Sequence, residues 1–293
     1  MVPPKVNFNY PRIIRPSAQR QLDQVSDGDT PVIKQPIRMV SCDTPEKAGY
    51  AGNPEKSQPK LDRCRERLEN GFYDTLPEKL REYLIKKLSD DAAEQHISAG
   101  NDATNEFNKL LKQRLTKPDG KKRGVATIPT GEIIDQYGRL LAYLAPWFAD
   151  TKTDPLPPKD DPQRRTFNLD MIENGWAAFF PIYPSLPRND DMNLAIAAAE
   201  AAWKKKLGIW KSYGRNVLLG YEFRACIKLA KAKNPDKGIE NAFQRVCVDL
   251  RSLKIVGPYS FWKIDPCYRL WVWKKDLDDA VEALDLKEET PVN

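Results

Sequence analysis

The sequence has little histidine and no paired cysteines, and these two shortages limit the chemistry that it can carry. His96 is the only histidine among 293 residues. This excludes zinc sites built from several imidazoles and the two-histidine helix of metalloproteases. The five cysteines are scattered, odd in number and contain no CxxC pair, so we expect reduced, mostly buried thiols rather than a zinc knuckle or a full disulfide framework. Enzymatic chemistry in this chain would therefore rest mostly on carboxylates.

Long apolar runs are also absent. The N-terminus lacks the apolar core of an export signal, and no stretch approaches the roughly 20 apolar residues that span a bilayer. We therefore expect no membrane association. If the natural chain begins at Met1, this favours a cytoplasmic protein; a secreted protein is the alternative if an export signal was removed before Met1.

Charge is present in both signs but unevenly distributed. The chain carries a formal net charge of +6, and its last 18 residues hold seven acids against one lysine, a net of −6, so residues 1–275 carry +12. Such an excess favours a polyanionic partner such as DNA or RNA, although a basic balance by itself bears only on solubility and association.

The first two thirds of the chain reads as a mixture of short strands and helices. Residues 1–20 resemble an N-terminal arm, and 151–162 form a proline-rich excursion. Apolar spacing predicts helices over 77–88, 102–115 and 194–207, and short strands over 24–40, 124–128 (with a turn at 129–131) and 133–144. His96 lies in a polar stretch, which favours a solvent-facing helix residue.

The pattern changes after Arg215, and we expect residues 215–293 to form a small α/β module with an acidic C-terminal tail. Helical spacing covers 217–231, 238–250 and a short segment around 277–284, while 261–264 and 268–273 read as aromatic strands. The tryptophans of these strands fit a core, with base stacking as the alternative. A protein partner for this module is a further possibility.

Three short motifs and one helix gather residues suited to phosphodiester chemistry. The motifs are DGDT at 27–30, R-x4-DTPE at 38–46 and DQYGR at 135–139, and the helix runs into KKKLGIW at 204–210. Asp29 and Asp43, with the carbonyl of Thr44, offer hard oxygen ligands for Ca²⁺ or Mg²⁺, and Glu46 is placed to hold a water. Two forked arginine donors suit a phosphate whose negative charge grows during reaction. Read singly, each motif also fits an ordinary turn, helix cap or loop.

In this order the four pieces resemble the staphylococcal nuclease (thermonuclease) family. The resemblance implies that Asp29, Asp43 and Thr44 bind Ca²⁺, that Glu46 activates the attacking water, and that Arg38 and Arg139 stabilise the phosphate. It also implies that Tyr137 and Tyr183 lie beside the nucleotide. Gln136 and Ser185 stand where the family often has a lysine and a second tyrosine, so base stacking and affinity are expected to differ.

The same resemblance implies the fold and the activity. The fold class is α+β: a five-stranded OB-type β-barrel with flanking helices over residues 21–214, carrying a helical insertion at about 53–100, followed by the C-terminal module. The activity is Ca²⁺-dependent, sequence-nonspecific hydrolysis of DNA or RNA to 3′-phosphate products. The alternative is a non-catalytic nucleic-acid-binding or scaffold module of the same fold.

Overall fold

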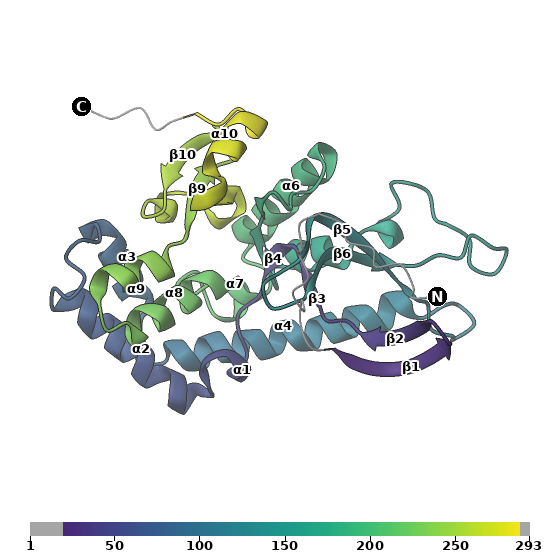
Figure 1. Cartoon of the computed structure of the whole chain (residues 1–293), viewed down its shortest axis with the longest axis horizontal. Helices are drawn as coiled ribbons and strands as arrows, with labels where there is room; N and C mark the ends of the chain where they lie inside the picture. Colours follow the sequence, from purple (N-terminus) through teal and green to yellow (C-terminus); the bar gives the residue numbers. More distant parts are fainter. Residues whose placement is uncertain (1–19, 288–293) are drawn as a thin grey trace, which may run out of the picture.

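The computed structural model describes residues 20–287 and has an α+β fold, as predicted (Figure 1). The expected N-terminal arm therefore lies almost wholly outside the described residues, as do Glu288 and Glu289 of the acidic tail. Figure 1 shows a helical half on the left and a strand-rich half on the right, with the long helix α4 (Ala92–Leu115) running along both. Among residues 20–287, no helix is long and apolar enough to cross a membrane.

The described strands pair into four separate sheets. Their members are the hairpin β1 (Gln21–Asp27) and β2 (Thr30–Lys34); β3 (Ile37–Met39), β6 (Leu140–Pro146) and β5 (Val125–Ile134); β4 (Ser41–Asp43) and β7 (Ala178–Phe180); and β10 (Lys254–Gly257), β9 (Arg245–Asp249), β11 (Arg269–Trp273) and β8 (Ile182–Tyr183). Within residues 20–287 these pairings do not close a barrel, so the five-stranded barrel is not confirmed.

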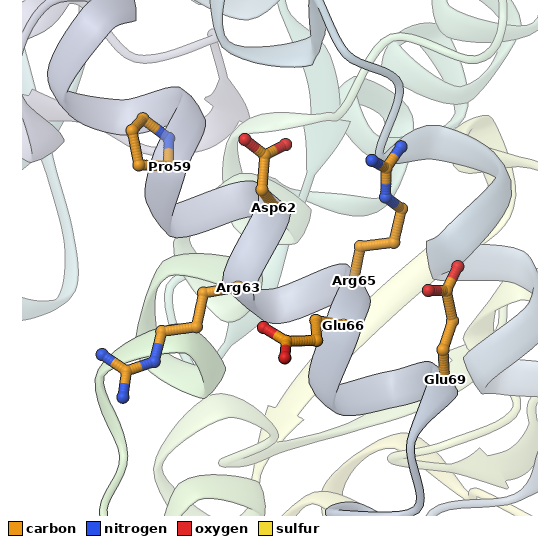
Figure 2. Close-up of a pocket in the computed structure, with 6 residues that line it drawn as sticks. All are labelled: Pro59, Asp62, Arg63, Arg65, Glu66 and Glu69. Atoms are coloured by element: carbon orange, nitrogen blue, oxygen red, sulfur yellow. The ribbon is translucent and has the colours of Figure 1, made fainter.

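The predicted insertion is helical. Within its predicted range, about 53–100, it contains α2 (Pro54–Glu69), α3 (Glu78–Lys87) and the first turns of α4, while the short helix α1 (Ala48–Ala51) precedes it. Helix α4 begins before the predicted Asp102 because Ala93, Ile97 and Ala99 are buried and continue its apolar face. The exposed side of α2 carries a shallow hollow of about 500 Å³ lined by Pro59, three acids and two arginines (Figure 2). Its charges largely face solvent, and it brings no catalytic grouping together.

The remaining helices lie between residue 167 and residue 284. They are α5 (Phe167–Glu173), α6 (Asn189–Lys205), α7 (Ile209–Ser212), α8 (Gly220–Lys231), α9 (Pro235–Ala242) and α10 (Leu277–Leu284), with 3₁₀ turns at Pro162–Arg164, Phe261–Lys263, Pro266–Tyr268 and Lys274–Asp276. The predicted helices at 194–207, 217–231 and 277–284 are thus confirmed.

Three predicted elements are wrong. Residues 238–250 are not one helix, because α9 ends at Ala242 and residues 245–249 pair with β11 as β9. Residues 261–264 contain a 3₁₀ turn rather than a strand, and the two buried side chains, Phe261 and Ile264, are three residues apart instead of alternating as in a strand. The turn expected at 129–131 is absent because β5 continues through it to Ile134, opposite the start of β6.

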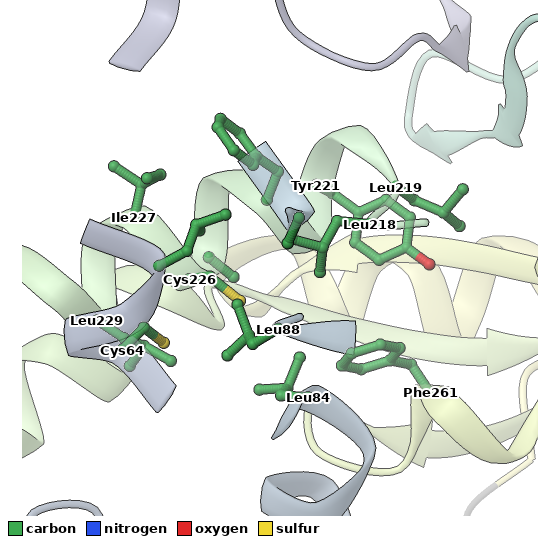
Figure 3. Packing of buried hydrophobic residues seen from close by; sticks show 14 of the residues in the cluster. Cys64, Leu84, Leu88, Leu218, Leu219, Tyr221, Cys226, Ile227, Leu229 and Phe261 are labelled. Atoms are coloured by element: carbon green, nitrogen blue, oxygen red, sulfur yellow. The ribbon is translucent and has the colours of Figure 1, made fainter. Parts of the chain in front are cut away.

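One hydrophobic core joins the insertion to the C-terminal module. Leu84 and Leu88 of the insertion lie with Tyr221, Cys226 and Phe261 in the same cluster (Figure 3). Burial of Trp271 and partial burial of Trp262 in this cluster fit the core interpretation of the aromatic strands. All five cysteines are free and buried, as expected. Residues 215–287 therefore share a core with the insertion.

A buried ion pair ties the insertion to α8. Lys87 Nζ on α3 lies 2.6 Å from Glu222 Oε2 on α8, and the Tyr83 hydroxyl donates to Glu222 Oε1 at 2.5 Å. Burial lowers the pKa of the Lys87 ammonium, while Glu222 opposes that shift. Because an unpaired charge at this depth is costly, the pair fixes how α3 sits on α8.

Candidate active site

The carboxyl end of β4 brings the first two site residues together. Arg38 lies in β3, which runs parallel to β6, and Asp43 ends β4 opposite Ala178 of β7. Arg38 Nη2 donates to Asp43 Oδ1 at 2.8 Å. The chain then leads through Thr44 and Pro45 to Glu46 before α1 begins, so the DTPE motif forms a connection at the strand end.

Asp43 is buried and paired with two arginines. Its side chain has no exposed surface, and Arg224 Nη2 of α8 lies 3.0 Å from both of its oxygens. Burial raises the pKa of this carboxyl, but the guanidinium groups of Arg224 and Arg38 outweigh burial and leave the pKa below its ordinary value. Asp43 is thus an ionised carboxylate whose two oxygens already accept hydrogen bonds.

Glu46 is the more accessible carboxylate of the site. Its side chain is 26% exposed, and Arg224 Nη1 donates to Glu46 Oε1 at 2.5 Å. The guanidinium of Arg224 therefore bridges Asp43 and Glu46, with one nitrogen directed to each carboxylate. This bridge brings both acids of the motif to one cation.

His96 is buried and accepts a hydrogen bond from the backbone of Glu46. The prediction that it faces solvent is therefore wrong. The side chain is fully buried in α4, where Nε2 accepts from the Glu46 N–H at 2.8 Å. Nδ1 lies 2.8 Å from the Leu218 carbonyl, and the ring stacks on Phe223 at 3.9 Å between centroids. Since Nε2 accepts, the imidazole is neutral with its proton on Nδ1. Burial lowers its pKa to about 4.

Arg139 and Tyr137 lie on the turn between β5 and β6. Arg139 Nε donates to Asp135 Oδ2 at 2.8 Å, and its side chain is 38% exposed. Tyr137 is 68% exposed and lies beneath the Arg139 guanidinium, 5.3 Å from ring centroid to carbon. Tyr50 follows Glu46 closely; partial burial raises its pKa, Arg224 opposes the rise, and Glu46 and Tyr137 add to it. Tyr137 is therefore within electrostatic reach of the site.

Three predicted residues stand differently. Asp29 lies at the exposed tip of the β1–β2 hairpin, where its carboxylate accepts a hydrogen bond from the Thr30 hydroxyl. This hairpin does not pair with β3 or β4. The Thr44 carbonyl is pressed against the start of α8, 2.6 Å from where a Cβ of Gly220 would stand. Tyr183 is partly buried in β8 and packs against a small apolar cluster. Among residues 20–287, neither Asp29 nor Tyr183 forms a hydrogen bond or an ion pair with Asp43 or Glu46.

The donor set does not fit the calcium ion that the resemblance implies. Both Asp43 oxygens accept from arginines, Glu46 accepts from the same Arg224, and the Thr44 carbonyl faces helix α8. Across residues 20–287, no three His, Cys, Asp or Glu side chains gather closely enough to hold a metal ion. Calcium prefers six to eight oxygens, several of them anionic, whereas here a guanidinium fills the space between the two acids.

A comparison with known protein families identifies the family of this chain. A family model described as staphylococcal nuclease homologue matches residues 36–212, more than half of the chain. The chain belongs to this family. No curated protein matches the chain closely enough to be compared with it. The matched range holds Arg38, Asp43, Glu46 and Arg139 of the nuclease motifs, but starts after Asp29 and ends before Arg224.

Sequence reasoning about the nuclease motifs missed the residues that arrive from outside them. Arg224 belongs to an ordinary amphipathic helix, and no sequence pattern around Arg224 indicates that it pairs with Asp43. Arg245 of β9 is a second such residue: burial, then the charge of Arg224, lowers its pKa to about 10. It lies over the Phe180 and Trp273 rings at 4.9 Å each, with Asp43 within electrostatic reach. Arg224 and Arg245 therefore add positive charge around Asp43.

Proposed function

We propose that this chain hydrolyses phosphodiester bonds in nucleic acids. Members of the staphylococcal nuclease family are nucleases or bind nucleic acid, and the family's members are generally hydrolases. The observation that carries the proposal is the partly exposed Glu46 carboxylate beside the guanidinium groups around Asp43. A general base next to fixed positive charge is what attack of water on a phosphodiester requires.

The proposed roles follow from side-chain chemistry. Glu46 takes a proton from a water molecule while the water oxygen bonds to phosphorus and the bond to the 5′ oxygen breaks. The leaving oxygen takes a proton from solvent, which yields a 3′-phosphate and a 5′-hydroxyl. Arg38 and Arg139 neutralise the charge that grows on the phosphate oxygens, Arg139 by turning from Asp135. Tyr137 offers an exposed ring for a neighbouring base.

We assign no step to calcium. The resemblance implies that Asp29, Asp43 and Thr44 bind it, and this calcium dependence stays a prediction; the pairing of Asp43 with two arginines does not support it. The proposal covers both DNA and RNA, since the assigned residues act on the phosphodiester group that the two polymers share.

The second candidate is a module that binds nucleic acid without cleaving it. One observation favours it: Arg224 Nη1 donates to Glu46 Oε1 at 2.5 Å, so this oxygen already accepts a hydrogen bond from the protein instead of facing a water molecule. Such a module would keep the arginines for phosphate contacts and use the carboxylates to hold them in place.

Turnover against binding separates the two candidates. Single- and double-stranded DNA and RNA would be incubated with the full chain, once with Ca²⁺ and once with excess EGTA, while binding is followed by fluorescence anisotropy. The proposal predicts cleavage of at least one substrate with 3′-phosphate ends. Saturable binding of every substrate without any cleavage, in either buffer, would leave the binding module.

A further inference from the structure

Arg224 lies outside the family match, yet it holds both carboxylates of the site. The match ends at residue 212, and Arg224 comes from the following helix α8. Its two terminal nitrogens reach separate acids, Nη1 to Glu46 and Nη2 to both oxygens of Asp43. Only a planar, forked donor can satisfy two carboxylates at once in this way.

The start of α8 is built to deliver Arg224 to this place. A Cβ on Gly220 would stand 2.5 Å from Asp43 Oδ2, so only glycine lets the first turn approach the carboxylate. Arg224 follows four residues later on the same helix face. Phe223 stacks on His96, which in turn binds the Glu46 backbone. The side chain of Arg224 is 20% exposed, so its position is set by the packing of α8.

The charges balance without any added cation. Asp43 and Glu46 supply two negative charges, and Arg38 and Arg224 supply two positive charges within hydrogen-bonding distance of them. Arg245 adds a third positive charge nearby; in the described residues it has aromatic partners and no carboxylate at ion-pair distance. A divalent cation would therefore enter a surrounding that is already neutral to positive.

We propose that Arg224 takes the place of the divalent cation in this site, so that the C-terminal module supplies the positive charge facing the substrate phosphate. The inference rests on the proposed function for its substrate, but its claim about the cation concerns Asp43 and Glu46 alone. The wild-type site then binds Ca²⁺ poorly, and removing the guanidinium exposes two carboxylates to which Ca²⁺ binds.

Calcium binding, measured without nucleic acid, tests the replacement. Wild type, Arg224→Gln and the control Arg251→Gln would be titrated with Ca²⁺ by calorimetry and with Tb³⁺ by luminescence excited through the nearby Tyr50. The control variant loses the same charge as Arg224→Gln. Arg251 is paired with a carboxylate away from the site, and two of its nitrogens donate to Asp249 at 2.9 and 2.8 Å. Circular dichroism and thermal unfolding would confirm that each variant is folded.

We expect Arg224→Gln to bind Ca²⁺ at least about tenfold more tightly than wild type and Arg251→Gln, because a fixed cation a few ångströms away repels the ion. Equal affinity in Arg224→Gln and wild type would overturn the proposal. So would saturable wild-type binding with a Kd below about 1 mM, the weak end of protein calcium sites, and this arm needs no variant to fold. A chain without any hydrolysis would refute the proposed function but leave the binding comparison decisive for Arg224.

Discussion

At the scale of the residue, His96 shows how one buried side chain governs the site. It is fully buried, accepts from the Glu46 N–H and is neutral, since burial lowers its pKa to about 4 from an ordinary 6.5. Protonating it removes the acceptor for Glu46 and places a charge in the core. The unfolded chain binds that proton near pH 6.5 and the folded chain only near pH 4, so the contribution to stability is complete above pH 6.5 and is lost as the pH falls toward 4.

The first prediction concerns stability in acid. Between pH 8 and pH 4.5 the wild-type chain should lose about 2–3 kcal/mol of unfolding free energy through His96, from 1.36 kcal/mol per pKa unit. His96→Gln lacks this titration, so the difference in unfolding free energy between wild type and variant should shrink over that range. Urea unfolding at both pH values measures it; an unchanged difference would show that His96 does not titrate as described.

Single residues were predicted well where chemistry is local and poorly where it depends on distant contacts. The lack of any CxxC pair predicted free, mostly buried cysteines, and all five are free and buried. His96 was misplaced because its polar neighbours suggest solvent, whereas its partners, Glu46 and Leu218, lie 50 and 122 residues away. No sequence pattern of its own helix reports such partners.

At the scale of the element, α4 and α8 meet the DTPE connection through glycines. A Cβ on Gly100 of α4 would stand 2.5 Å from the Glu46 carbonyl oxygen and 2.9 Å from that of Pro45. These are backbone atoms and cannot move aside as a flexible side chain would. The close approach of α4 is what lets His96, one turn earlier, reach the Glu46 N–H.

The second prediction tests this close approach. In an ordinary helix Gly→Ala is favourable by up to about 1 kcal/mol, but Gly100→Ala should destabilise the chain by about 1–3 kcal/mol because the connection must shift. Gly49→Ala is the matched control, since it lies in helix α1 with nothing within 4 Å of its Cβ position. Denaturant unfolding compares the two; a neutral or stabilising Gly100→Ala would contradict the packing.

Elements with strong periodicity were predictable, and those with ambiguous periodicity were not. In helices α3, α6, α8 and α10 the apolar residues recur at helical spacing and do not alternate as in a strand. Residues 238–250 fit helical spacing through Ile239, Ala242 and Val246, yet the β-branched pair around Cys247 joins a sheet with β11 and is buried on both sides. Pairing with a distant strand decided this segment, and a single sequence does not carry that information.

At the scale of the whole molecule, residues 215–287 pack as part of the same body as the region that matches the family. They share one core with the insertion, contain the buried acid Glu222 that pairs with Lys87, and supply Arg224 to the site. The motif at 38–46 pointed to Arg38, Asp43 and Glu46 because these three residues lie within one short stretch of sequence. Arg224 could not be predicted, since only the shared core of insertion and module places it there.

The third prediction follows from this shared core. A chain cut after Gly214 exposes the part of the cluster that the insertion supplies, including Leu84 and Leu88, and removes Glu222, the partner of Lys87. We expect it to lack a cooperative unfolding transition and to aggregate, whereas the full chain unfolds cooperatively. Thermal unfolding followed by circular dichroism measures this. A soluble 1–214 fragment with its own sharp transition would show that the module is dispensable for folding.

The most direct test of the central claim is the rate of phosphodiester hydrolysis by wild type and Glu46→Gln, measured side by side on the same labelled oligonucleotide. Both proteins would first be shown to bind it and to unfold at similar temperatures. Glutamine keeps the size of the side chain but cannot take a proton, so the account predicts a rate lower by about 10²–10⁴-fold with binding retained. Equal rates in the two proteins, or no hydrolysis by wild type on any nucleic acid, would contradict it.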